Sequence, residues 1–255
     1  MTGDIKRHNS KLVWFDLEPN DEKEFITIYI LLDSKITLIE TGPACSHESL
    51  VRGINRAGIA LSDIDFIVPT HIHLDHFGGG GHIMEVCNNA KAIVHPNAAY
   101  HVSNVDKWWS GSLDFLGEVA ELYGEPLPIP EERIVSAENG FELNLGISTL
   151  KAMHTPGHAP HHITWINNNS AFVGDSLGLW YPEINKAFPV TPGYYRHDLA
   201  LQSINSMSKL NLEEIFYTHF GPRPAAGAFK EILDEFQTWM SIVEGGINKN
   251  LNSEK

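Results

Sequence analysis

The chain has 255 residues, of which 42% are apolar, enough for a sizeable core and too many for a disordered protein. Its formal net charge is −14 and its 18 Lys and Arg residues are scattered, so we expect no nucleic-acid partner. Cys45 and Cys87 are the only cysteines, which excludes a disulfide framework and a thiolate zinc site.

The N-terminal part of the sequence carries no pattern typical of a secreted or membrane protein. Residues 1–10 are polar and lack the apolar centre of a signal peptide. The longest largely apolar run, Phe25–Leu32, is far shorter than the roughly 20 residues that span a bilayer. We therefore expect a cytoplasmic protein without a membrane partner. The sequence leaves the oligomeric state open.

The first half of the chain alternates strand and helix patterns. Its predicted elements are, in chain order, a strand pair over residues 25–42 with a turn at Asp33–Lys35, a helix over residues 46–59 with Ser46 as N-cap, a buried strand over residues 63–70, a strand over residues 90–96, and a mostly helical stretch over residues 97–125. A proline-rich connector follows at residues 123–133. The alternation favours a partly parallel sheet.

The second half supplies further strands and one long helix. Its predicted elements are a strand over residues 148–154, a hairpin around Asn167–Asn169, a strand ending at Thr218–His219, and a C-terminal helix over about residues 225–245 with Phe229, Leu233, Phe236 and Met240 on one stripe. No linker rich in Gly and Ser divides the chain. We therefore expect one α/β domain over residues 1–255, with the C-terminal helix packed on it.

The segment THIHLDHFGGGG, residues 70–81, concentrates metal-ligand side chains directly after a predicted strand. His71 and His73 are two positions apart, which in an extended chain places both on one side, roughly 7 Å apart along the backbone. Asp75 and His76 then lie on the turn into the next segment and are aimed at a second position. The glycines that follow, Gly78 to Gly81, allow tight bends and close approach of the backbone.

Three later strand ends carry residues of the same kind, namely His158, Asp175 and His219. Loops beyond strand ends are where an α/β scaffold normally carries its site. Imidazole and carboxylate groups without thiolates suit zinc, iron or manganese. Five histidines and two aspartates are too many for one tetrahedral ion. They are about right for two ions roughly 3.5–4 Å apart.

At these residues the chain resembles the metallo-β-lactamase superfamily. THIHLDH matches the HxHxDH signature, TPGHAPHH resembles the next ligand loop, GDS the bridging aspartate, and THFG the last histidine. Their order and spacing agree from about residue 24 to residue 221. The resemblance implies an α/β fold of four layers, an αβ/βα sandwich of two packed sheets with helices outside and the metals at one edge.

The resemblance also implies roles for single residues. It implies His71, His73 and His158 on a first metal, Asp75, His76 and His219 on a second, and Asp175 bridging the two. His161 and His162 follow His158 closely, and the sequence leaves open whether either faces the site. The sequence departs from the family pattern at Glu40, where the strand usually ends in Asp-Thr-Gly, and an extra methylene puts the role of that side chain in doubt.

The chemistry expected from such a centre is metal-assisted hydrolysis. Two divalent ions, zinc with iron or manganese as alternatives, lower the pKa of a bridging water from about 15.7 towards 7, and the hydroxide attacks a carbonyl. Asp75, with a second oxygen free, is the expected catalytic residue that carries a proton to the leaving group. We expect a small-molecule substrate that is an ester, lactone or thioester, as in the lactonase-like and glyoxalase II-like members.

Two other functions on the same fold, and one non-catalytic role, remain open from the sequence. One is a mononuclear iron oxidoreductase of the persulfide dioxygenase type, and another is a phosphodiesterase. A metal-binding protein without catalytic activity is the third. Aromatic residues after the bridging aspartate, Trp180, Tyr181 and Tyr194, are the candidates for substrate binding, although packing within the fold is the alternative for each.

Overall fold

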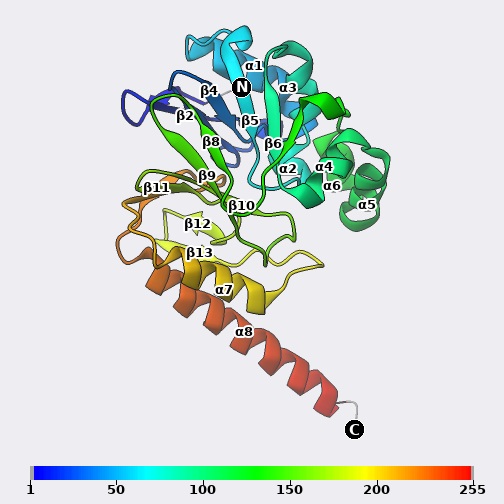
Figure 1. The fold of residues 1–255 in the computed structure, drawn as a ribbon. Helices are drawn as coiled ribbons and strands as arrows, with labels where there is room; N and C mark the ends of the chain where they lie inside the picture. The colour runs from blue at the N-terminus through cyan, green and yellow to red at the C-terminus, as the bar shows by residue number, and fades with distance from the viewer. Residues whose placement is uncertain (1–2, 254–255) are drawn as a thin grey trace.

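The protein consists of two β-sheets packed face to face, with helices on both outer faces (Figure 1). The computed structural model describes residues 3–253. Within those residues no helix has the length and apolar character needed to cross a bilayer.

The first sheet has seven strands, which follow one another in chain order. They are β1 (Lys6–Arg7), β2 (Leu12–Asp16), β3 (Thr27–Leu31), β4 (Ile36–Ile39), β5 (Ile64–Val68), β6 (Lys91–Val94) and β7 (Ile134–Ser136). The first four pair antiparallel, whereas β4 to β7 are parallel. The carboxyl ends of β4 and β5 therefore meet at the same edge.

The second sheet has six strands in the order β15-β14-β11-β10-β9-β8. They are β8 (Glu142–Asn144), β9 (Thr149–His154), β10 (Ile163–Asn167), β11 (Ser170–Phe172), β14 (Glu214–Phe216) and β15 (Pro222–Pro224). Only β11 and β14 pair in parallel, so their carboxyl ends also share an edge. A separate ribbon is formed by β12 (Leu179–Tyr181) and β13 (Lys186–Phe188).

Eight α-helices and four short 3₁₀ turns lie within the described residues. The helices are α1 (His47–Arg56), α2 (Leu74–Phe77), α3 (Gly80–Val86), α4 (Pro96–Ser103), α5 (Asp106–Leu116), α6 (Glu118–Tyr123), α7 (His197–Met207) and α8 (Ala228–Ser253). The 3₁₀ turns are η1 (Pro19–Asp21), η2 (Ala44–Ser46), η3 (Leu61–Asp63) and η4 (Glu131–Arg133).

Three apolar clusters hold the layers together and confirm the predicted four-layer sandwich. One cluster joins the outer face of the first sheet to α1, α3 and α4. A second lies between the two sheets around Trp165, and a third joins the second sheet to α7 and α8. The central strands β3, β4 and β6 are almost wholly buried, which explains their nearly continuous apolar sequence, whereas β8 and β9 alternate between buried and exposed positions.

The predicted strands and hairpins are found, but the structure has seven further strands that were not predicted, namely β1, β2, β7, β8, β12, β13 and β15. The helices differ as well. Ser46 precedes α1 as expected, but its side chain makes no capping hydrogen bond. The stretch 97–125 is divided into α4, α5 and α6, with Gly117 between the last two at φ 57° and ψ −129°. The C-terminal helix α8 starts at Ala228, later than expected, and extends away from the body (Figure 1).

The buried stripe of α8 also differs from the predicted one. Ala228, Ile232 and Phe236 are buried, whereas Phe229 and Leu233 are only partly buried against the third cluster. The stripe is therefore rotated about one position from the prediction, because the helix packs against α7 and the β13 strand rather than lying flat on a sheet.

Candidate metal centre

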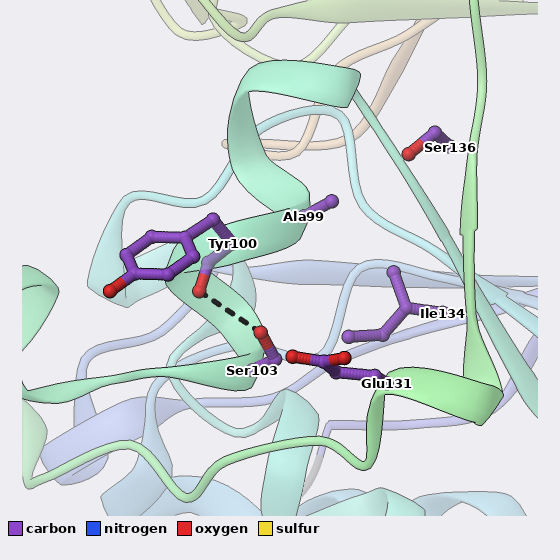
Figure 2. A pocket seen from close by; sticks show the side chains of 6 residues that line it. All are labelled: Ala99, Tyr100, Ser103, Glu131, Ile134 and Ser136. Atoms are coloured by element: carbon purple, nitrogen blue, oxygen red, sulfur yellow. Dashed lines mark hydrogen bonds between the residues drawn. The ribbon is translucent and has the colours of Figure 1, made fainter.

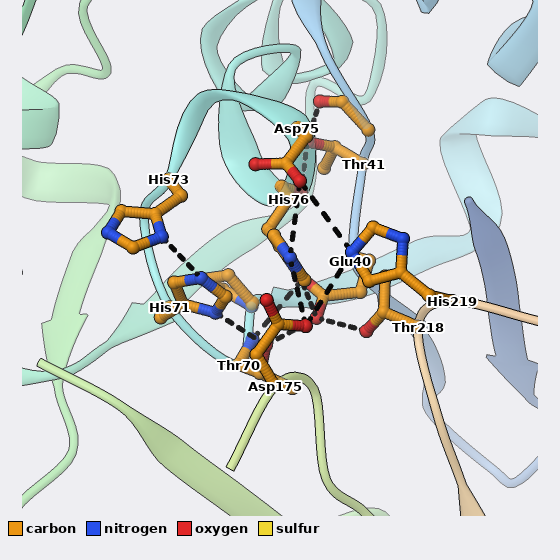
Figure 3. A network of polar contacts seen from close by, with 12 residues as sticks. Glu40, Thr41, Thr70, His71, His73, Asp75, His76, Asp175, Thr218 and His219 are labelled. Atoms are coloured by element: carbon orange, nitrogen blue, oxygen red, sulfur yellow. Dashed lines mark hydrogen bonds and ion pairs between the residues drawn. The ribbon is translucent and has the colours of Figure 1, made fainter. Parts of the chain in front are cut away.

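The seven predicted metal ligands come together at the edge where the carboxyl ends of the strands meet (Figure 3). His71 and His73 follow β5, and α2 carries the next two, Asp75 and His76. The remaining ligands arrive on separate loops, after β9, after β11 and after β14. Residues separated by up to about 150 positions in the chain thus converge, because each lies in a segment that follows the end of a strand in one of the two packed sheets.

The first ligand group consists of His71, His73 and His158. The Nδ1 atom of His73 lies 3.0 Å from Nε2 of His71 and 3.0 Å from Nε2 of His158. Four ligand atoms bound about 2.0–2.1 Å from a tetrahedral zinc ion lie about 3.3 Å apart. The separations in this group are therefore those expected around one ion.

The second ligand group consists of Asp75, His76 and His219. The Oδ2 atom of Asp75 lies 3.6 Å from Nε2 of His76 and 3.6 Å from Nε2 of His219. Asp175 stands between the two groups. Its Oδ2 lies 3.5 Å from Nε2 of His158, and its Oδ1 lies 3.4 Å from Nε2 of His76 and 3.6 Å from Nε2 of His219.

Unpaired buried atoms test whether this set fits metal ions. The Nε2 atom of His76 and the Oδ1 atom of Asp175 are both buried and have no hydrogen-bond partner among the described residues. A buried polar atom left unpaired costs about 1–3 kcal/mol. A cation between these atoms would satisfy both, so the residues present fit a metal.

Backbone carbonyls orient the histidines that arrive on separate loops. Nδ1 of His158 donates to the carbonyl of Val190 at 3.1 Å, and Nδ1 of His219 donates to the carbonyl of Phe25 at 2.6 Å. Each bond fixes the tautomer and leaves Nε2 as the free donor atom for a metal. The sequence does not indicate these partners, because every residue has a backbone carbonyl whatever its side chain.

Glu40 is the centre of the hydrogen-bond network beneath the ligands (Figure 3). It is fully buried, and its Oε1 accepts from the hydroxyls of Thr70 at 2.5 Å and Thr218 at 3.0 Å and from Nδ1 of His76 at 3.2 Å. Thr70 in turn accepts from Nδ1 of His71 at 3.1 Å. Glu40 thus orients His71 of the first group through Thr70, and it orients His76 of the second group directly.

The backbone of Glu40 is strained, which points to the same role. Its φ is 66°, in the left-handed region that non-glycine residues rarely adopt. This backbone conformation costs of order 1–3 kcal/mol and persists only where the surrounding structure holds it in place. The three hydrogen bonds to its Oε1 and a fourth from the backbone N–H of Thr70 to its Oε2, at 3.3 Å, offset that cost.

His162 supports the centre from behind, and this role was not anticipated. Its Nε2 accepts the backbone N–H of Asp175 at 3.3 Å, while its Nδ1 donates to the hydroxyl of Thr155 at 2.9 Å. Gly174 lies in the same contact at φ 48°, where an added Cβ would come within 2.3 Å of Oγ1 of Thr70. Only glycine fits this close approach.

The glycines after the HxHxDH motif also permit close approach, but they make no unusual turn. Gly78 and Gly79 have φ of −56° and −79°, which any residue adopts. A Cβ on Gly81 would come within 2.0 Å of the carbonyl of Leu127. The motif therefore requires glycine for packing of α3 rather than for bending.

The two ligand groups differ in how readily their imidazoles take up a proton. Burial, together with neighbouring imidazoles, lowers the pKa of His73 to about 3 and holds the pKa of His71 well below its usual value. Burial also lowers the pKa of His76, but Asp175, Asp75 and Glu40 outweigh it, so that pKa stands well above 6.5.

If each ligand group holds an ion, acidification is accordingly expected to release the ion of the second group before that of the first. Ligand imidazoles must be neutral, so below the raised pKa of His76 the affinity of its group should fall about tenfold per pH unit. The first group, whose His71 and His73 resist protonation, should lose little over the same range. Metal analysis after dialysis between about pH 8 and pH 5 measures this order. Simultaneous loss of both ions would contradict it.

The predicted substrate residues lie at different depths. The Tyr181 ring is half-buried and lies 4.8 Å from the ring of Phe220, the residue after His219. Trp180 is only 6% exposed and packs beneath the guanidinium of Arg223 at 3.7 Å. Tyr194 is 87% exposed. The sequence did not single out Phe25, whose ring lies 4.9 Å from that of His219.

A separate hollow on the surface does not belong to the centre (Figure 2). It encloses about 260 Å³ between α4, η4 and β7, and none of the predicted ligands lines it. Its lining residues are Ala99, Tyr100, Ser103, Glu131, Ile134 and Ser136.

Comparison with known proteins identifies the family. The model of the metallo-beta-lactamase superfamily matches residues 23–219, a span that ends on the last predicted ligand. The chain belongs to this superfamily. The superfamily consists mostly of hydrolytic metalloenzymes, and the His/Asp cluster fits a metal site.

Individual relatives are distant. A metallo-beta-lactamase fold-containing protein of Sulfurisphaera tokodaii is 24% identical over 90% of this chain and 87% of its own length. A solved archaeal metallo-beta-lactamase superfamily protein from Sulfolobus tokodaii superposes with a TM-score of 0.72 at 23% identity, over 85% of this chain and 81% of its own. An N-acyl homoserine lactonase from a Bacillus species is 24% identical over 68% of this chain and 62% of its own length.

Proposed function

We propose that this protein is a binuclear metal-dependent hydrolase that cleaves a carboxylic ester, a lactone or a thioester. The position of Asp175 carries the proposal, because one of its oxygens faces His158 and the other faces His76 and His219 at 3.4–3.6 Å. A carboxylate shared in this way is the arrangement used by two-metal hydrolases.

The residues present would hold two divalent cations, zinc with iron or manganese as alternatives. His71, His73 and His158 would hold the first and Asp75, His76 and His219 the second, with Asp175 common to both. Bound ions would supply Lewis acidity, bringing the pKa of a water from about 15.7 towards 7 and polarising a carbonyl oxygen.

Asp75 is the proposed proton carrier. Its side chain is 21% exposed, whereas those of His76, Asp175 and His219 are almost completely buried. Only Oδ2 of Asp75 faces the other ligands of its group. The second oxygen is therefore free to take a proton and deliver it to the departing oxygen or sulfur.

Charge around the centre supports a carbonyl substrate rather than a phosphodiester. Three of the cations that follow Asp175 in the sequence are paired with carboxylates: Lys186 with Glu235, Arg196 with Asp198 at 2.9 Å, and Arg223 with Glu231 at 3.1 Å. Paired cations attract a phosphate weakly, and the net charge of −14 repels polyanions at long range. The lactonase among the relatives supports the same choice.

The second ligand group favours the hydrolase over a mononuclear iron oxidoreductase. A single iron in the first group would leave Asp75, His76 and His219 gathered within 4.8 Å of one another without an ion. The test is metal analysis of freshly purified protein with an acyl-substrate screen and a measurement of oxygen uptake. Two ions per chain with acyl hydrolysis support the proposal, whereas one iron with oxygen uptake would overturn it.

Longer acyl chains are expected to lower the KM until the pocket is full. Tyr181, Phe220 and Phe25 form an aromatic wall beside His219. Burying one methylene contributes about 0.8 kcal/mol, or about fourfold in KM. Hydrolysis rates would be measured over short and long acyl esters and thioesters, with a phosphodiester and a β-lactam for comparison.

Tyr181→Ala should weaken this dependence on acyl length. Trp239→Ala, which removes an aromatic ring from α8, is the matched control and should leave the dependence as it is. Indifference to acyl length in the unmodified protein, or fastest turnover of the phosphodiester, would refute the acyl preference. The roles of Trp180 and Tyr194 stay predictions, tested by their own alanine variants in the same series.

A further inference from the structure

The metal centre reaches the surface at the start of α2. Five of the seven predicted ligands are buried, whereas His73 is only partly buried and the side chain of Asp75 is 21% exposed. His73 is the residue that precedes α2, and Asp75 lies in the first turn of that helix. A substrate therefore approaches the ligands beside the start of α2, and this approach is called the entrance below.

The segment 189–196, which joins β13 to α7, lies on one side of the entrance. The carbonyl of Val190 accepts a hydrogen bond from Nδ1 of His158 at 3.1 Å, and Nε2 of the same histidine lies 3.0 Å from Nδ1 of His73. At the other end of the segment, the backbone N–H of Arg196 donates to the carbonyl of the residue before His158 at 2.8 Å. The segment is thus fixed beside the first ligand group at both ends.

Helices α5 and α6 lie on the other side of the entrance. The α6 helix packs against α2, and α5 packs against α6. Ala120 anchors α6 because it is completely buried, whereas α5 contains no buried residue. Elements with few buried apolar contacts open at a low cost in free energy. The α5 helix is therefore the part of this side that moves away from the body most readily.

The two sides meet where the ring of Phe115, in α5, packs on Gly193. Gly193 lies in a turn of the segment 189–196, which is closed by a hydrogen bond from the backbone N–H of Tyr195 to the carbonyl of Pro192 at 2.8 Å. A Cβ on Gly193 would come within 2.7 Å of the Phe115 ring, and the three atoms nearest to it would all belong to that ring. This contact completes a ring of contacts that runs from α2 through α6 and α5 to the first ligand group.

We infer that Phe115 and Gly193 form a clasp across the entrance to the metal centre, which parts to admit a substrate and limits the bulk of the acyl chain that is hydrolysed. The limit on bulk rests on the proposed hydrolase function, whereas the clasp does not. Phe115 is 59% exposed, so its ring can swing away without opening the core. Gly193 is three positions from Val190, which places the clasp at most about 10 Å from the backbone that orients His158. An acyl chain that leads outward from the ligands therefore meets the clasp.

Two substitutions open the clasp from its opposite sides. Gly193 does not have a left-handed backbone, so Gly193→Ala is tolerated there, and the added methyl group displaces the exposed ring of Phe115. Phe115→Ala removes the ring itself. The matched controls are Gly111→Ala, whose added Cβ in α5 has nothing within 4 Å, and Leu122→Ala, which removes an exposed apolar side chain from α6.

Hydrogen exchange measured by mass spectrometry tests the clasp in the protein as purified. In Gly193→Ala and in Phe115→Ala, the segment 189–196 should exchange about tenfold faster, because its turn loses the contact with α5. The double variant should exchange no faster than either single variant, since the methyl group then meets no ring. Both controls should match the unmodified protein. Unchanged exchange in Phe115→Ala, or additive effects in the double variant, would overturn the clasp.

Two esters of the same alcohol test the limit on bulk, namely a hexanoate and a hexanoate that carries a naphthyl group at the far end of its chain. The naphthyl group lies away from the carbonyl, so the two ester bonds are equally reactive. The unmodified metal-loaded protein should prefer the plain hexanoate by about tenfold in kcat/KM, and either Phe115→Ala or Gly193→Ala should reduce this preference to less than about twofold. Both controls should retain it. A preference that persists in Phe115→Ala would overturn the limit on bulk.

The two measurements distinguish failure of this inference from failure of the hydrolase proposal. If no acyl substrate is hydrolysed, the hydrolase proposal fails, and hydrogen exchange still decides whether the clasp exists. If esters are hydrolysed but exchange of the segment 189–196 does not respond to Phe115→Ala, the clasp is refuted and the hydrolase proposal stands. Faster exchange together with an unchanged ester preference supports the clasp and refutes its effect on the substrate.

Discussion

Replacing Asp175 by asparagine is expected to dismantle the paired metal centre. The substitution keeps the size of the side chain but removes the negative charge and turns one ligand oxygen into an NH₂ group, which cannot ligate. Both ligand groups face this carboxylate at 3.4–3.6 Å, so both should weaken. We expect loss of at least one ion and a fall in acyl hydrolysis of more than about 100-fold, the upper end of what changes around a ligand produce.

Glu40→Asp is the comparison for this experiment. It keeps the charge but shortens the side chain that holds Thr70, Thr218 and His76, while every candidate metal ligand keeps its own donor atom. Metal affinity should fall by about 10–100-fold, less than for Asp175→Asn. Metal content by elemental analysis and affinity by competition with a chelator measure both. Equal losses in the two variants would reverse the proposed order of the two carboxylates.

Replacing His73 by alanine is expected to empty the first ligand group and leave the chain folded. Its Nδ1 is the atom that lies 3.0 Å from both other histidines of the group. The second group contains no atom of His73 and should keep its ion. Hydrolysis should fall by at least about 100-fold, because a single ion cannot both hold the carbonyl and activate water in the proposed way.

The fold should withstand this change because His73 contributes little to the core. It is only partly buried and stays neutral, so its removal leaves no unpaired charge. The melting temperature of the metal-free protein should shift by no more than a few degrees, which circular dichroism measures. His197→Ala, at the start of α7 and outside the cluster, is the control. Full occupancy of both sites in His73→Ala would refute the ligand assignment.

The recognition of the family and of its ligand motif needed only the sequence. His71, His73, Asp75 and His76 fall within six positions, so their arrangement is largely local, and the β-branched runs that carry them already predict strands. Burial on both faces makes central strands such as β3 and β4 nearly continuously apolar, which is why these strands could be predicted from the sequence. The order of the strands in two sheets required the family resemblance.

Other features were decided by tertiary structure. Whether Glu40 could replace the usual aspartate depended on the distances from its carboxylate to Thr70, Thr218 and His76, which lie after β5, after β14 and in α2. Periodicity reports which face of an element is apolar, but it carries no information about contacts between side chains far apart in the chain. The same reason hid the anchoring of His219 by a backbone carbonyl.

The helices illustrate the same division. The sequence predicted a mostly helical stretch over residues 97–125, whereas the structure ends α6 at Tyr123, before Gly124 at φ 84°, and packs it against η2 and α2. The sequence predicted the seven candidate ligands by type and order, because metal chemistry restricts ligands to a few side chains. Only the packing of the sheets decided which of their atoms face one another and which other residues, such as Glu40 and His162, support them.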